Sequence, residues 1–100
     1  MVDMVHELVV ATVDPAKRDE YIKVWKAAWK EAGFEGSHGG KILRCVEDPS
    51  RVTMVLNWDS VEAHAKHRGT DKHNHFREQF APFQTQPSVV QHYTFEELPG

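Results

Sequence analysis

The segment from Trp58 to Phe83 constrains the fold most, because it has the pattern of a helix broken in the middle. Asp59 or Ser60 can cap its start by accepting hydrogen bonds from free backbone N–H groups. Gly69 interrupts the helical pattern, and Thr70 can cap a second helix. One face of that second helix carries aromatic side chains at positions i, i+3, i+7 and i+10: His73, Phe76, Phe80 and Phe83.

The rest of the chain predicts one further helix and a sheet. The helix is expected over about residues 16–32, because Asp14-Pro15 is a start signal and Gly33 a stop. Residues 34–40, rich in glycine, are expected to form a mobile flap beside a cavity. Four stretches are typical of strands: residues 5–13, 41–47, 51–58 and 89–96. The order β-α-β-β-α-β predicts a ferredoxin-like α+β fold, in which an antiparallel four-stranded sheet carries both helices on one face.

The apolar pattern of the strands predicts a dimer. In residues 51–58, Val55 points to the face opposite Met54 and Leu56, so both faces carry apolar side chains. Residues 5–13 show the same two-sided pattern. Two helices can cover only one face, and a second copy of the sheet is the simplest cover for the other. We therefore expect a homodimer, related as in a dimeric α+β barrel.

Composition limits the classes of function. One hundred residues, 40% of them hydrophobic, predict a single domain over residues 1–100. A net charge of −3 and the lack of a basic run argue against nucleic acid. No apolar stretch is long enough to cross a membrane, and no signal-peptide core is present. The lone Cys45 excludes an internal disulfide, so a cytoplasmic protein is expected.

The predicted topology, followed by W-D-S-x-E-A-H-x-x-H-x-x-T-D-x-H from Trp58, resembles the antibiotic biosynthesis monooxygenase (ABM) family of dimeric α+β barrels. The resemblance runs from Val5 to about Phe95. It implies an oxidoreductase that uses no metal or flavin. In such members a phenolic or enolic substrate is deprotonated and then passes an electron to dioxygen. A phenol, quinol or anthrone-type substrate is therefore expected here.

That chemistry needs an apolar cavity, a base and an oxyanion donor. A histidine with a pKa near neutrality is a suitable base. His67, where the resemblance places a histidine beside the pocket, is the first choice, and His73 the second. Asn57 is the expected oxyanion donor if it faces the helices. The residues expected to line the substrate pocket are Trp58, His64, Phe76 and Phe80.

Structural roles compete with these assignments. His64 and His75 also fit solvated surface histidines, and His73 fits a hydrogen-bonded core residue. Trp58 also fits a core position, as do Phe76 and Phe80. A metal site needs three or four converging ligands, and none is expected with one Cys and no established third ligand.

Two departures from the family pattern separate the alternatives. Arg77 occupies the position that supplies the axial histidine in haem-degrading members, which argues against haem. Leu56 stands where many members carry a carboxylate, two residues before the aromatic at Trp58. Three hypotheses remain: a cofactor-independent monooxygenase, a non-catalytic dimer that binds a small aromatic or acyl ligand, and a haem-handling protein.

Overall fold

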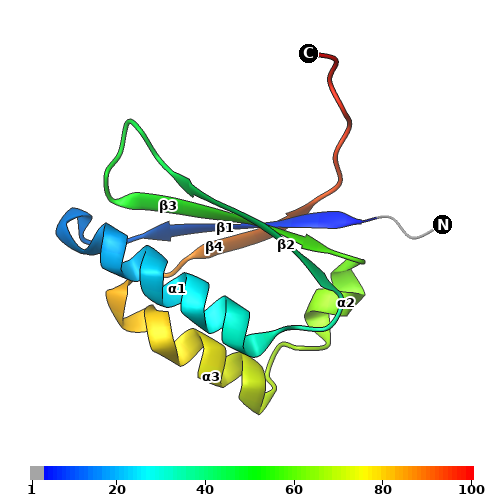
Figure 1. The fold of residues 1–100 in the computed structure, drawn as a ribbon, viewed down its shortest axis with the longest axis horizontal. Helices are drawn as coiled ribbons and strands as arrows, with labels where there is room; N and C mark the ends of the chain where they lie inside the picture. Colours follow the sequence, from blue (N-terminus) through cyan, green and yellow to red (C-terminus); the bar gives the residue numbers. More distant parts are fainter. Residues whose placement is uncertain (1–3) are drawn as a thin grey trace.

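The computed structural model describes residues 4–100 and shows an antiparallel sheet with helices on one face (Figure 1). The strands are β1 (Val5–Thr12), β2 (Ser37–Arg44), β3 (Arg51–Trp58) and β4 (Val89–Tyr93). The helices are α1 (Arg18–Ala32), α2 (Val61–Ala65) and α3 (Asp71–Phe80), with 3-10 turns at Pro15–Lys17 and Ala81–Phe83. The strand order is β2-β3-β1-β4. The ferredoxin-like fold predicted from the sequence is confirmed.

The break between α2 and α3 forms through local capping. Ser60 Oγ accepts a hydrogen bond from the backbone N–H of Ala63, 3.0 Å away, and begins α2. Gly69 then adopts φ +79°, a left-handed conformation that side chains with a Cβ rarely adopt. Thr70 Oγ1 accepts from the N–H of His73 and begins α3. The predicted broken helix is therefore present, with its break at the predicted glycine.

Strand β2 begins earlier than predicted. It starts at Ser37, so most of the expected flap over residues 34–40 is strand. The pairing of β2 with β3 is irregular between Ser37 and Gly40. A Cβ at Gly40 would lie 1.9 Å from the carbonyl oxygen of Val55. The glycines therefore let the two backbones approach closely here, and they do not form a separate loop.

The core lies between the sheet and helices α1 and α3, which lie side by side (Figure 1). Trp25 of α1 is 3% exposed and stacks on Trp29, with ring centroids 5.6 Å apart. Its other ring neighbours are Phe76 and Phe80 of α3. Ile22, Trp25, Ala28 and Ala32 are buried along the same face of the helix, which we call the α1 stripe. Within residues 4–100, no helix has both the length and the apolar character needed to cross a membrane.

Within residues 4–100, no helix lies on the second face of the sheet (Figure 1). Alternation along the paired strands brings apolar side chains to this face from all four strands. They are Leu8, Val10, Leu43, Val55, Val89 and Tyr93. Leu43 is 46% and Val89 56% exposed, which is high for large apolar residues in a sheet.

Candidate active site

A cavity of about 310 Å³ lies between the sheet and the broken helix. Six of its fifteen lining residues are Trp or Phe, from α1, β3, α3 and the loop after α1. The other lining residues come from β1, β3, α3, β4, the segment before β4 and the segments around the break. The lining residues are Glu7, Val9, Trp25, Trp29, Phe34, Leu56, Trp58, His64, Arg68, His73, Phe76, Arg77, Phe80, Ser88 and Val90.

A buried carboxylate, Glu7, lies in the wall of this cavity. It is 5% exposed, and its Oε1 accepts a hydrogen bond from Trp58 Nε1 at 2.8 Å. Glu7 was not among the residues predicted for the site, although the alternation of Val5, Glu7 and Val9 along β1 could have revealed it. In the β1–β3 register Glu7 lies opposite Leu56, the position where the family pattern has a carboxylate. A neighbouring strand therefore places a carboxylate close to that position.

The structure places His64 inside the protein, so its interpretation as a surface residue was wrong. The side chain is 4% exposed and stacks on Trp58, with ring centroids 4.8 Å apart. His64 Nε2 lies 3.5 Å from Glu7 Oε1, and Nδ1 lies 2.7 Å from His92 Nε2 on β4. The turn that follows the Ser60 cap directs this side chain toward the sheet, which helical spacing alone does not show.

The burial of Glu7 and His64 favours the uncharged form of both. Burial raises the pKa of the Glu7 carboxyl, although the Trp58 N–H and the charge of Arg68 act in the opposite direction. Burial, together with the nearby His92 and Arg68, lowers the pKa of His64 to about 4. At neutral pH His64 is therefore an uncharged imidazole, able to donate through one ring nitrogen and accept through the other.

The two histidines predicted as bases have different surroundings. His73 lines the cavity and is half-buried, and within residues 4–100 no group hydrogen-bonds its ring. Burial lowers the pKa of His73, and Arg77 and Arg68 lower it further. His67 is outside the cavity wall, and its Nε2 lies 2.7 Å from the carbonyl oxygen of Glu35. The geometry favours His73 over His67 as the base.

Asn57 lies on the other face of the sheet, so the condition for its role as an oxyanion donor is not met in this chain. Its Oδ1 lies 2.6 Å from Nδ1 of His6, and neither residue lines the cavity. Two cations that the sequence analysis did not assign line the cavity instead, Arg68 and Arg77. Since His73 and Arg77 are four residues apart on α3, helical spacing could have identified this pair.

The remaining predicted lining residues are all in the cavity wall. Trp58, Phe76 and Phe80 are each at most 6% exposed, so they belong to the core and to the wall at once. Substrate contact by these residues stays a prediction. Within residues 4–100, no group of three or more His, Cys, Asp and Glu side chains is arranged to hold a metal ion.

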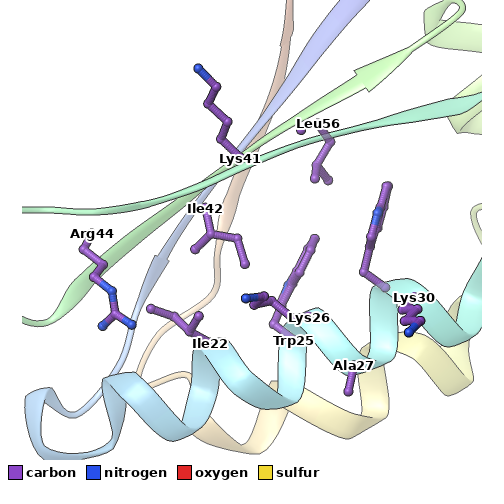
Figure 2. A pocket seen from close by; sticks show the side chains of 11 residues that line it. Ile22, Trp25, Lys26, Ala27, Lys30, Lys41, Ile42, Arg44 and Leu56 are labelled. Atoms are coloured by element: carbon purple, nitrogen blue, oxygen red, sulfur yellow. The ribbon is translucent and has the colours of Figure 1, made fainter.

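A second, more open cavity of about 620 Å³ lies between α1 and β2 (Figure 2). Figure 2 shows Ile22 and Ile42 facing each other across this groove, whereas Lys41 points away from α1. Trp25, Trp29 and Leu56 line both cavities. The larger cavity has no histidine or carboxylate in its lining, so it offers no base at neutral pH. The smaller cavity is therefore the candidate active site.

Comparisons with known proteins agree with this architecture. The family model described as antibiotic biosynthesis monooxygenase matches residues 4–79. A solved structure from Bordetella bronchiseptica, named as a candidate antibiotic biosynthesis monooxygenase, has a TM-score of 0.87 and 23% identity, over 95% of this chain and 99% of that one. A similarly named structure from Nitrosomonas europaea has a TM-score of 0.79 and 19% identity, over 100% and 97% of the two chains. None of the curated proteins matches the chain. At these identities the likeness to solved structures concerns the fold alone.

Proposed function

The chain belongs to the antibiotic biosynthesis monooxygenase family, and on that premise we propose that it is a cofactor-independent monooxygenase for a small aromatic substrate of the phenol, quinol or anthrone type. The observation that carries the proposal is His73, whose imidazole lies in the wall of the cavity and has no hydrogen-bond partner within residues 4–100. A lowered pKa keeps this imidazole neutral at pH 7 and able to accept a proton.

The size of the cavity favours a substrate with one or two rings. Its volume of about 310 Å³ is at the lower end of the ~300–1,000 Å³ that small-molecule sites span. Trp29, Phe34 and Trp58 offer ring faces and edges for an aromatic substrate. We therefore expect hydroquinones and naphthohydroquinones to be better substrates than the three-ring anthrones.

The reaction begins with proton removal. His73 takes the proton of the substrate, and Arg68 or Arg77 holds the oxyanion that forms, since a guanidinium stays charged at any relevant pH. The electron-rich anion then reduces dioxygen, and one oxygen atom is added to the substrate. The second oxygen atom leaves as water, and the substrate supplies all the electrons. The aromatic wall excludes bulk water from the reactive anion.

Oxygen consumption tests this proposal directly. The purified protein is mixed with hydroquinone, naphthohydroquinone and anthrone, and oxygen uptake is compared with the uptake of the same solutions without protein. We expect protein-dependent uptake, with one labelled oxygen atom in the product when the gas is ¹⁸O₂. Binding of these compounds with no uptake above the blank would contradict the proposal and favour a ligand-binding protein.

We also propose that the chain forms a homodimer through the helix-free face of the sheet. Light scattering after size exclusion should give a mass twice the 11.5 kDa of the chain at micromolar concentration. Val55→Lys, at the centre of this face, should shift the protein toward monomer, because a charge would be buried in the interface. Val46→Lys, at a 90% exposed site off the face, is the matched control. A wild-type mass of 11.5 kDa would exclude the dimer.

A further inference from the structure

We propose that Glu7, His64 and His92 form a proton relay that connects the substrate cavity with the protein surface at β4, and that Glu7 is the proton donor of the reaction. The proposal deepens the function proposed above and depends on it for its kinetic consequences. It rests on a chain of side chains from three elements: β1, α2 and β4.

The inner end of the proposed relay is Glu7, which lines the cavity. Glu7 Oε1 accepts a hydrogen bond from Trp58 and lies 3.5 Å from His64 Nε2, whereas Oε2 has no hydrogen-bond partner within residues 4–100. In the same range Trp25 Nε1 is the single fully buried polar side-chain atom without a partner. Glu7 Oε2 is therefore not fully buried, and Glu7 lines the space that a substrate would occupy.

The middle of the proposed relay is His64, which as a neutral imidazole can pass on a proton without staying charged. Neutral imidazole has one donor nitrogen and one acceptor nitrogen, and a proton that arrives at one side can leave from the other. His64 Nδ1 lies 2.7 Å from His92 Nε2, within hydrogen-bonding distance. His64 Nε2 lies 3.5 Å from Glu7 Oε1, so a shift of a few tenths of an ångström closes this link.

The outer end of the proposed relay is His92, which is partly exposed to solvent. His92 lies on the edge strand β4 and is half-buried, whereas His64 is 4% exposed. Three charged or titratable side chains approach the relay histidines His64 and His92 from the helical side: Arg68, His67 and His73. Together with burial they disfavour an imidazolium at His64, so a proton passes through this site in a concerted step.

The donor role completes the proton balance for hydroquinones and anthrones alike, because in both the carbon that binds dioxygen keeps one hydrogen and becomes a carbonyl carbon. His73 takes the first proton, and the substrate anion reduces dioxygen to a bound peroxide anion. Glu7 protonates that peroxide. The O–O bond then breaks, and the remaining C–H proton leaves with the hydroxide as water. His73 releases its proton to solvent, and Glu7 regains one from solvent through His92 and His64.

The test is loss of turnover in His92→Ala and its rescue by imidazole. We expect kcat to fall about tenfold or more, since general acids contribute ~10²–10⁴ in rate and solvent retains part of the supply. Added imidazole should restore most of this loss. 1-Methylimidazole, which cannot pass a proton from one ring nitrogen to the other, should not. His75→Ala, at an exposed histidine paired with Glu31, is the control with unchanged kcat.

A second measurement does not need turnover. ¹⁵N NMR of the ring nitrogens in the free protein should show His64 as a neutral imidazole with a hydrogen-bonded Nδ1. This signal should shift in His92→Ala and in His92→Gln, and it should not shift in His75→Ala. A freely rotating or charged His64 at pH 7 would overturn the relay, and so would full turnover in His92→Ala. A wild type without oxygen uptake would overturn the proposed function and the donor role, whereas the NMR would still decide whether the chain of hydrogen bonds exists.

Discussion

His73→Gln is expected to lower kcat/KM for a turned-over phenol by about 10²–10⁴, the usual contribution of a general base. The glutamine keeps a side chain of similar size in the cavity wall but cannot accept a proton from the substrate. Because the side chain is half-buried and its ring has no hydrogen-bond partner within residues 4–100, the free energy of unfolding should change by less than about 1 kcal/mol. Steady-state oxygen uptake and urea denaturation measure the two effects.

The control for this variant is on the same helix. His75→Gln changes an exposed histidine that binds Glu31 outside the cavity, so activity should stay at the wild-type value. His67→Ala should also retain most of the activity, because that ring is bound to the carbonyl oxygen of Glu35. If His67→Ala loses the activity and His73→Gln keeps it, the base is His67, as predicted from the sequence.

The pH profile of the wild type provides a further check on this assignment. A base must be deprotonated to act, and burial lowers the pKa of His73 below its ordinary value near 6.5. Consequently the acid limb of kcat/KM, where the rate falls as the base is protonated, should have its midpoint below pH 6.5. An acid limb with its midpoint above 6.5 would contradict His73 as the base.

Trp25→Ala is expected to lower the free energy of unfolding by about 3–5 kcal/mol, as other aromatic-to-alanine changes in cores do. The indole is 3% exposed and contacts rings from both α1 and α3, so its loss leaves a cavity where the two helices meet the sheet. The collapse of such a site is limited, because Trp29 and Phe76 are held by other neighbours. A urea titration followed by far-UV circular dichroism measures the effect.

The matched control is the next residue of the same helix. Lys26 is exposed, so Lys26→Ala should change the free energy of unfolding by less than about 0.5 kcal/mol. A Trp25→Ala protein as stable as the Lys26→Ala protein would show that the α1 stripe does not hold the core together.

Much of the fold could be predicted because its signals are local. The cap at Thr70, the break at Gly69 and the stop at Gly33 each act within a few residues of chain, and the structure shows all three. Strand alternation likewise separates the two faces of β3. The start of β2 was misplaced because Ser37–Gly40 joins the sheet through close contact with β3, and glycine composition does not distinguish a strand edge from a loop.

The candidate site could be predicted only in part. Its aromatic wall follows from helical spacing, since Phe76 and Phe80 share a face of α3. The sequence did not show whether His67 or His73 is the better base. The difference is that His67 contacts the carbonyl oxygen of Glu35, which is 32 residues away along the chain. Strand alternation predicted that Asn57 and Trp58 point to opposite faces of the sheet. It did not predict which of these faces the helices cover, and that decides whether Asn57 reaches the cavity.

By itself, the sequence determined which segments form helices and strands, where they are capped, and that both faces of the sheet are apolar. Only the tertiary structure decided that Glu7, Trp58, His64 and His92 meet in one cluster. The physical reason is distance along the chain: Glu7 and Trp58 are 51 residues apart, and His64 and His92 are 28 apart. Propensity and periodicity act over one or two turns of chain. The burial that favours the uncharged forms of Glu7 and His64, and the contacts between these residues, arise only when strands and helices from both halves of the sequence pack together.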